Sequence, residues 1–228
     1  MSEFPYVGDE LSLFAGAHRW KAYLRGRFAP HVHGDVLEVG AGIGANTTAL
    51  AGLGFDSWTS LEPDAALAAK IPRASSRHRV AVGTLEDVGG TFDTLLYIDV
   101  LEHIADDRGE LVRAAAHLAP EGALIVLSPA HPWLYTPFDA AIGHHRRYTR
   151  AALRAIAPTS LQEVELRYLD AAGMLASLGN RLLLRAAMPT ARQVEVWDRW
   201  LVTSSRWLDP LTFGLVGKSI LGVWRRVP

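Results

Sequence analysis

The chain of 228 residues contains no cysteine, which excludes disulfide bonds, thiolate metal ligands and a thiol nucleophile. It has no excess of either charge, since 23 basic and 24 acidic residues leave a net charge of −1. No uncharged apolar run reaches the roughly 18 residues that a membrane-spanning helix needs. The opening MSEFPYVGDE lacks the basic and apolar regions of a secretory signal. We therefore expect a cytoplasmic protein, with no composition that points to a nucleic acid.

What the chain does have is enough apolar side chain, 49% of all residues, for one well-buried domain. Apolar periodicity predicts strands at residues 35–40, 57–62, 78–83, 92–99, 122–129, 161–170 and 213–227. It predicts helices at residues 11–28, 45–54, 63–70, 107–119, 150–157 and 175–204. Strands that alternate with helices indicate right-handed crossovers and a mostly parallel sheet.

The segment DVLEVGAGIGANTTAL, residues 35–50, changes from a strand through three glycines into a helix. Gly40 and Gly42 permit positive φ and let a ligand approach bare backbone, while the following helix offers unpaired N–H groups. Glu62 ends the next predicted strand, where a carboxylate can accept both hydroxyls of a ribose. These features suit either a dinucleotide or S-adenosylmethionine and do not separate the two.

Three motifs together resemble those of one family. VLEVGAGIGANT, LEPD and YIDVLEHI are similar to motif I, the acidic motif after it and the fourth-strand motif of class I S-adenosylmethionine-dependent methyltransferases. Glu38 before the first glycine, the DVLEHI segment and the two final strands favour this family over a nicotinamide-dependent oxidoreductase. The resemblance implies an α/β fold with a Rossmann-like, seven-stranded, mostly parallel sheet and helices on both faces.

The resemblance also implies how the single domain is divided. Residues 1–33 would form an N-terminal helical cover and residues 34–128 the cofactor-binding core. Residues 129–228 would supply the substrate-side loops, a C-terminal helical lid and the last two strands. The residues implied for binding S-adenosylmethionine are Glu38, Gly40, Ala41, Gly42, Glu62, Pro63, Leu85, Glu86, Ile98 and Asp99.

The ends of the cofactor would divide among these residues. Glu38 and the glycines would face the methionine part and Glu62 the ribose, while Leu85 would lie on the adenine ring. Thr84 stands where the family often has an aspartate, so Glu86 would meet the adenine amino group instead.

The DVLEHI segment spaces Asp99, Glu102 and His103 at i, i+3 and i+4, which on a helical turn is one face. It is similar to the E-x-x-E-H arrangement with which ubiquinone-pathway O-methyltransferases and plant small-RNA 2′-O-methyltransferases hold a divalent cation. Oxygen ligands with one imidazole would suit Mg²⁺ or Mn²⁺. The alternative is a generic turn of the family, with His103 bonded to backbone.

Residues 130–149, rich in proline, glycine, histidine and aromatics, form a predicted loop that follows the fifth strand. Loops of this length are usually functional. The candidate catalytic residues are His103, His131, His144, His145 and Tyr148, with a histidine as general base. Arg146, Arg147 and Tyr148 would clamp a polar acceptor. The alternative is a solvated helix start with Thr149 as N-cap. The other histidines, His18, His31, His33, His78 and His117, are expected to be structural or solvated.

The C-terminal part is rich in tryptophan and leucine: Trp197, Trp200, Trp207, Trp224 and Leu182–Leu184. Such residues at helical spacing are usually core. They would also suit an apolar lid over a lipophilic acceptor, or a surface that touches a membrane. The arginines that would suit an anionic surface are Arg181, Arg185, Arg192 and Arg199, although the balanced total charge weakens that interpretation.

The sequence therefore predicts methyl transfer from S-adenosylmethionine to a small molecule or sugar-bearing metabolite. The expected acceptor atom is an oxygen, with nitrogen as the second choice. Two alternatives stay open: a short nicotinamide-dependent oxidoreductase, and a non-catalytic adenosylmethionine-binding or membrane-associated partner. A homodimer is possible. RNA is a poor candidate because the chain has no basic stripe or stacking platform for a single strand.

Overall fold

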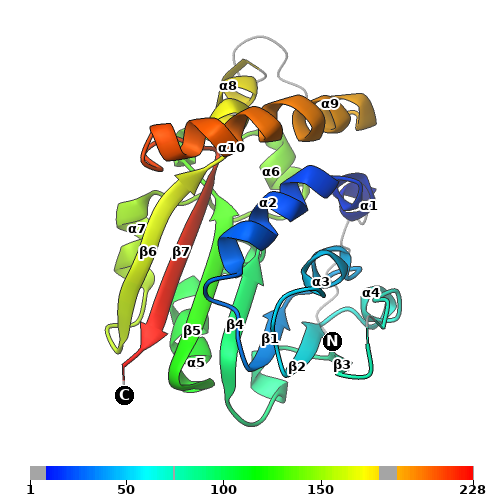
Figure 1. Ribbon diagram of the computed structural model, residues 1–228, viewed down its shortest axis with the longest axis vertical. Helices are drawn as coiled ribbons and strands as arrows, with labels where there is room; N and C mark the ends of the chain where they lie inside the picture. The colour runs from blue at the N-terminus through cyan, green and yellow to red at the C-terminus, as the bar shows by residue number, and fades with distance from the viewer. Residues whose placement is uncertain (1–8, 74, 180–188, 228) are drawn as a thin grey trace.

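The computed structural model describes residues 9–73, 75–179 and 189–227 of the chain (Figure 1). Seven strands form one sheet in the order β3-β2-β1-β4-β5-β7-β6. They are β1 Asp35–Val39, β2 Ser57–Glu62, β3 His78–Val82, β4 Phe92–Ile98, β5 Leu118–Pro129, β6 Leu161–Leu169 and β7 Ser219–Arg226. The first five are parallel, and β7 pairs antiparallel with both β5 and β6. The predicted seven-stranded, mostly parallel sheet is confirmed.

Helices lie on both faces of this sheet (Figure 1). They are α1 Asp9–Ala15, α2 His18–Phe28, α3 Ala45–Leu50, α4 Ala65–Ala68, α5 Asp107–Ala116, α6 Pro137–Ala141, α7 Arg150–Ile156, α8 Ala171–Gly179, α9 Ala191–Val196 and α10 Val202–Leu211. A π-helical stretch, Trp197–Leu201, joins α9 to α10. Short 3₁₀ turns cover Leu85–Asp87, Leu101–His103 and Pro132–Leu134. None of the helices within the described residues is long and apolar enough to span a bilayer.

The strand β4 shows why both faces are covered. Leu96 and Ile98 pack into one hydrophobic core with α2 and the α9–α10 helix, while Leu95 and Tyr97 pack into a second core with α5 and α7. Side chains of a strand alternate between faces, so a strand with apolar residues on both sides must be buried on both. The almost continuous apolar runs of the central strands therefore reflect two cores.

The predicted helix at residues 11–28 is wrong as a single element, because the chain breaks between α1 and α2. Lys21, on α2, donates from Nζ to the carbonyls of Phe14 and Ala15 at 2.6 and 3.2 Å. A lysine that bonds to the last carbonyls of α1 satisfies groups that a continuing helix would have satisfied itself. Gly16 lies at this break, and a glycine inside the apolar pattern was the feature of the sequence that could have predicted it.

Several predicted boundaries also move. The strand β5 begins at Leu118, where a helix was expected as far as residue 119, and β7 begins only at Ser219. Pro63 precedes α4, whose N-cap is Asp64, so the proline is not in the first helical turn. The long helix expected over residues 175–204 is divided: α8 ends at Gly179, and a second helix runs from residue 191 to 211. Leu182–Leu184, Arg181 and Arg185 lie outside the described residues.

Candidate functional site

The glycine turn after β1 is a strained backbone that glycine alone accommodates. Gly40 has a φ of +68°, and a Cβ there would lie 2.7 Å from a methyl of Val100. Its N–H donates to the carbonyl of Leu61 at 2.8 Å, which ties the turn to β2. Gly42, with a φ of +58°, faces the side chain of Leu11 on α1. The first helix therefore lies against the turn, as the predicted N-terminal cover requires.

Glu62 holds this turn from the end of β2. Its Oε2 accepts from the N–H of Gly42 at 2.7 Å, and its Oε1 accepts from the N–H of Asp64 at 3.0 Å. Burial raises the pKa of Glu62, while these two backbone bonds oppose the rise. Each carboxylate oxygen can accept more than one hydrogen bond. The carboxylate is thus placed beside the glycine turn, where the predicted ribose contact would be made.

Glu38 is placed differently from what the motif suggested. Its side chain is buried, and Oε2 accepts from the hydroxyls of Thr47 and Ser60 and from the indole N–H of Trp58, the last at 3.0 Å. Desolvation raises the pKa of Glu38 to about 6. These bonds join β1, α3 and β2 beneath the turn. Glu38 therefore supports the turn from inside, and its predicted contact with methionine stays a prediction.

On the far side of the turn, Leu85 and Glu86 follow β3. Leu85 is buried within the second core, while the side chain of Glu86 is exposed and lies 3.7 Å from Arg113 in an ion pair. Thr84 is the N-cap of this 3₁₀ turn and bonds to Asp87. The predicted contact of Glu86 with the adenine amino group stays a prediction.

Asp99 stands directly after β4 with a φ of +54°, an uncommon conformation for a residue other than glycine. Its side chain is accessible to solvent, yet desolvation raises its pKa to about 6, and the nearby basic side chains His144, Lys218, Lys21 and Arg147 oppose this rise. An accessible carboxylate enclosed by protein is expected on the floor of a binding site. Ile98 before it is buried, as are Ala41 and Glu62.

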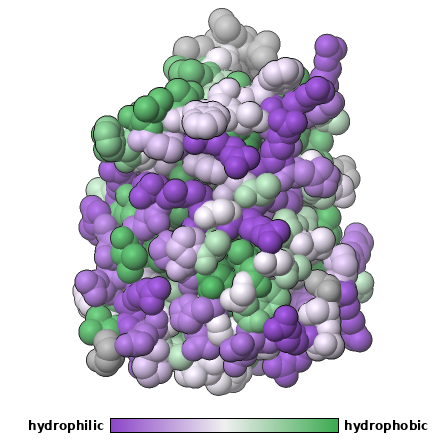
Figure 2. Space-filling view, viewed as in Figure 1, coloured by the Kyte–Doolittle hydropathy of each residue, from purple (hydrophilic) through white to green (hydrophobic). Residues whose placement is uncertain are grey.

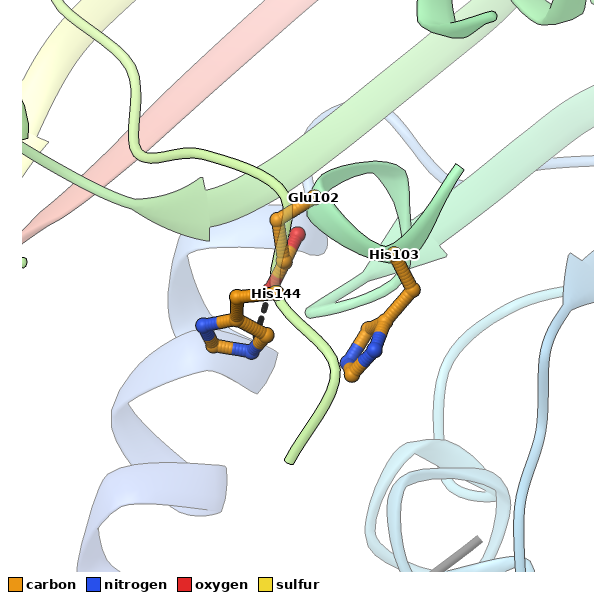
Figure 3. Close-up of side chains that lie close together, drawn as sticks. All are labelled: Glu102, His103 and His144. Atoms are coloured by element: carbon orange, nitrogen blue, oxygen red, sulfur yellow. Dashed lines mark ion pairs between the residues drawn. The ribbon is translucent and has the colours of Figure 1, made fainter. Parts of the chain in front are cut away.

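Three side chains that lie close together, Glu102, His103 and His144, form the most unusual group of the site (Figure 3). Glu102 and His103 come from the 3₁₀ turn after β4, and His144 comes from the loop after α6. Each offers one ligand atom, and these atoms all lie within 4.8 Å of one another. The Nε2 of His144 is 3.7 Å from the Oε1 of Glu102, and the two imidazole rings meet edge to face at 4.6 Å.

Glu102 is 0% exposed, and neither of its carboxylate oxygens has a hydrogen-bond partner among the described residues. The hydroxyl of Ser128 meets no hydrogen-bond criterion either, although it lies close enough to Glu102 to lower the pKa of that carboxyl. Desolvation, then the charge of Asp99, raises the pKa of Glu102 well above its usual range. Desolvation and the neighbouring His144 and His145 lower the pKa of His103 to about 4. Near neutral pH His103 is therefore uncharged, which is the form that binds a metal or accepts a proton.

Asp139 on α6 fixes the orientation of His144. It is 0% exposed, accepts from Nε and Nη2 of Arg147 at 2.8 and 2.9 Å, and lies 2.9 Å from Nδ1 of His144. Although burial opposes it, the bonds from His144 and Arg147 hold the pKa of Asp139 well below its usual range. A charged carboxylate at Nδ1 places the proton there, so Nε2 faces Glu102 as an acceptor.

The other candidates from the loop are not part of this group. His131 lies against Tyr168, with ring centroids 4.4 Å apart, and its Nε2 is 3.1 Å from the carbonyl of Gly217. His145 is exposed, with its backbone N–H on the carbonyl of Glu102. Tyr148 is buried, and its hydroxyl donates to Asp107 at 2.8 Å. Their catalytic roles stay predictions, and the arrangement favours His144 over them.

The group of possible metal ligands in the structure differs by one residue from the predicted set of Asp99, Glu102 and His103. Asp99 is near enough to influence the charge of Glu102 but does not belong to the converging group, whose third member is His144. The i, i+3, i+4 argument assumed an α-helical turn. The segment is a 3₁₀ turn that begins only at Leu101, so Asp99 does not share a face with Glu102 and His103.

Sequence analysis missed Asp139, Lys21 and Lys218. Lys218 lies 3.5 Å from Asp170 and 3.8 Å from the centre of the Trp197 ring, and desolvation lowers its pKa. Nothing in the sequence relates Lys218 to Asp99, because they are 119 positions apart (218 − 99). Asp139 precedes His144 by five residues, and that short spacing was the signal that could have found it.

Comparisons with known proteins agree with this fold. A family model described as a methyltransferase domain matches residues 14–173. The N-methyltransferase NodS from Bradyrhizobium japonicum WM9 is similar in structure, with a TM-score of 0.59 at 16% identity over 93% of this chain and 97% of that one. Coclaurine N-methyltransferase gives 0.60 at 15%, over 91% and 72%. Phosphoethanolamine N-methyltransferase 2 from Haemonchus contortus gives 0.62 at 14%, over 96% and 58%. At such identities these structures show the fold alone. No curated protein sequence matches the chain significantly.

Proposed function

Because the chain belongs to the family of S-adenosylmethionine-dependent methyltransferase domains, we propose that its methyl acceptor is an oxygen or nitrogen atom of a small molecule or sugar-bearing metabolite. The acceptor would bind beside Glu102, His103 and His144. Membership in this family removes the oxidoreductase alternative. The observation that carries the proposal is the buried Glu102, which has no hydrogen-bond partner among the described residues and lies against two imidazoles next to the accessible Asp99.

The cofactor end of the site is the glycine turn. The backbone of the turn at Gly40 and Gly42 would face the methionine part, and Glu62 would offer its remaining lone pairs to the ribose. S-adenosylmethionine supplies a methyl group on a positively charged sulfur. Asp99, the nearest accessible carboxylate beyond β4, would lie on that side of the cofactor and stabilise its charge.

The acceptor end must align a nucleophile and remove its proton. In the transfer, the carbon–sulfur bond breaks, its electron pair stays on sulfur, and a lone pair of the acceptor forms the new bond to carbon. The acceptor's proton would pass to Nε2 of His144, whose Nδ1 proton is held by Asp139. A buried setting excludes water from this step, so the enzyme's contribution is mainly alignment and proton removal.

As an alternative to proton transfer to Nε2 of His144, we propose that Glu102, His103 and His144 hold a divalent cation, with this Nε2 as a ligand instead of a base. Two imidazoles and a buried carboxylate whose oxygens meet no hydrogen-bond geometry among the described residues fit such an ion, which would supply partners for Glu102. Two nitrogen ligands and one oxygen suit Mn²⁺ or a later transition metal better than Mg²⁺, which prefers oxygen. When bound, the cation would act as a Lewis acid that lowers the pKa of an acceptor hydroxyl.

The function is tested by a labelled screen. Purified protein is mixed with CD₃-labelled S-adenosylmethionine and a metabolite extract, with EDTA, without it, and with Mn²⁺ restored after EDTA. A product that carries CD₃ in place of hydrogen establishes the transfer and identifies the acceptor. No product despite measured cofactor binding supports the non-catalytic alternative.

Two variants locate the chemistry once an acceptor is known. Glu102→Gln keeps the size of the side chain and removes the charge that would bind a cation. Glu121→Gln is the matched control, because Glu121 is an exposed glutamate near the beginning of strand β5. Loss of activity in the first variant and not in the second supports the assignment. Activity that resists EDTA but needs Glu102 would make the group a proton acceptor without a metal.

A further inference from the structure

The helix that runs from α9 through the π-helical stretch into α10 has two faces of different character. Val194, Trp197, Val202 and Ser205 face the protein and are buried. The opposite side and the turn after it expose large apolar side chains: Val196, Trp200, Trp207, Leu208, Leu211, Phe213 and Leu215. Trp207 is 77% and Phe213 83% exposed. A soluble surface rarely carries several such side chains together, and where it does they usually mark an interaction site.

These side chains form one continuous surface. Trp200 follows Val196 by one helical turn, Trp207 follows Trp200 by two, and Leu211 follows Trp207 by one, so all four lie along one side of the helix. This helix crosses the end of the sheet at which the parallel strands finish (Figure 1). Hydrophobic side chains gather where α10 ends, on the outside of the molecule (Figure 2).

The charges beside this surface are almost all positive. Within residues 191–215 the exposed charged side chains are Arg192, Arg199 and Arg206 with only Glu195 of opposite sign. The acids Asp198 and Asp209 of the same helix are buried against α2, where they bond to Trp20 and Tyr23. The local charge is therefore basic although the charge of the whole chain is balanced. The balanced total charge thus does not count against an anionic partner for this surface.

We propose that this surface, residues 191–215, docks on an anionic phospholipid bilayer, with the helix lying in the plane of the headgroups. Tryptophan prefers the boundary between headgroups and acyl chains, and arginines keep their charged ends among phosphates while their stems cover apolar surface. The guanidinium of Arg199 lies 5.4 Å over the Trp200 ring, which places the charge at the edge of the apolar stripe.

Charge also decides between a bilayer and a second copy of the chain. A symmetric dimer through this face would bring the arginines of one copy against the same basic face of its partner. Like charges across an interface are unfavourable, whereas anionic headgroups complement them. The occupant that fits both the tryptophans and the arginines is therefore a lipid surface.

Docking would bring the site to the membrane. On the inner face of the same helix, Trp197 donates from Nε1 to Asp170 at 2.6 Å and lies under Lys218, whose charge reaches Asp99. A helix held between the bilayer and the site would place the acceptor side near the headgroups. If the proposed function holds, the acceptor is then a head group or sugar carried by a lipid; the docking itself does not depend on that function.

The test is co-sedimentation of the whole chain with vesicles of phosphatidylcholine alone or of phosphatidylcholine mixed with phosphatidylglycerol. We expect binding to the anionic vesicles, weaker binding to the neutral ones and a decrease with added salt. A chain that stays in solution with both kinds of vesicle overturns the proposal. The measurement needs neither cofactor nor acceptor, so its failure leaves the proposed function untouched.

Two double variants show whether this surface is responsible. Trp200→Ser with Trp207→Ser should weaken binding about tenfold or more because it removes the apolar anchors. Arg199→Gln with Arg206→Gln should weaken it about fivefold for each arginine. The matched control combines Val112→Ser on α5 with Arg79→Gln on β3, both exposed. An equal loss in this control overturns the assignment. So does a Trp200/Trp207 variant that binds vesicles normally but changes mass in sedimentation velocity, since the face would then join two copies.

Discussion

Glu38 and Glu102 are two glutamates buried near the carboxyl ends of neighbouring strands, yet their surroundings are opposite. Glu38 is 2% exposed and receives hydrogen bonds from Thr47, Trp58 and Ser60. Glu102 is 0% exposed, and neither oxygen has a hydrogen-bond partner among the residues that the structure describes. The first carboxylate completes a structural network. The second is complete only with a proton or a ligand.

The comparison shows how burial alone can mislead. Desolvation raises the pKa of both groups, to about 6 for Glu38 and well above the usual range for Glu102. Burying a charge is costly unless it is paired and hydrogen-bonded, so Glu38 is compensated by its donors and Glu102 is not. Desolvation therefore favours the protonated form of Glu102, and a divalent cation that bound there would displace such a proton.

The largest effect is expected at Glu102. Glu102→Ala should lower methyl transfer at least about a hundredfold, because the charge that would hold a cation is lost. The free energy of unfolding should stay equal or rise, since an unpaired buried carboxylate is removed. Turnover is measured on the acceptor from the labelled screen, and unfolding in urea. A large loss of stability would show that Glu102 is a structural residue like Glu38.

Glu38→Ala should have the reverse pattern. It leaves two buried hydroxyls and an indole N–H without their acceptor, at a cost of about 3 kcal/mol in the free energy of unfolding. Binding of a divalent cation by the folded variant should be unchanged. Urea unfolding and calorimetric titration with Mn²⁺ check both parts. A Glu38→Ala variant as stable as the parent would contradict a structural role for the hydrogen bonds that Glu38 accepts.

Asp139→Asn should weaken the binding of a divalent cation through its effect on His144. The amide can no longer fix the Nδ1 proton as the carboxylate does, so affinity for a divalent cation should fall about tenfold to a hundredfold. The variant also loses an ion pair with Arg147, so a folded state must be confirmed by circular dichroism. If histidine resonances show the same tautomer of His144 before and after the change, Asp139 does not position it.

The smallest effect is a pH dependence at Glu38. Its folded pKa is raised from 4.5 to about 6, so the folded state binds more protons than the unfolded state between those values. The stability of the parent should therefore fall, relative to Glu38→Gln, by about 2 kcal/mol as pH rises through this window. Urea unfolding of both proteins at several pH values checks the difference. Parallel profiles would mean that Glu38 titrates normally.

The local backbone of the predicted cofactor half could be predicted because its requirements are local. A strand, glycines with positive φ and an acid at the end of the next strand all lie within residues 35–62. The hydrogen bond from Gly42 to Glu62 was not predicted, and the contact of Glu62 with the ribose stays a prediction. The acceptor half could not be predicted in the same way. His144 joins Glu102 from 42 positions away (144 − 102), through a loop without periodicity that Asp139 and Arg147 hold together.

Local geometry limited two further predictions. Asp99 was grouped with Glu102 on the assumption of an α-helical turn, whereas the chain makes a 3₁₀ turn with Asp99 before it. Trp197 and Trp200 were considered together, yet one is buried against Asp170 and the other is exposed. Composition reports how many tryptophans there are, and only the helix decides which face each one occupies.

The most direct test of the difference between the two glutamates is a titration of the metal-free protein with Mn²⁺, followed by electron paramagnetic resonance. We predict one bound Mn²⁺ per chain in the parent and in Glu38→Gln, and loss of this binding in Glu102→Gln. No bound Mn²⁺ in the parent, or equal binding in all three proteins, would contradict the proposal that Glu102 is a ligand of a divalent cation.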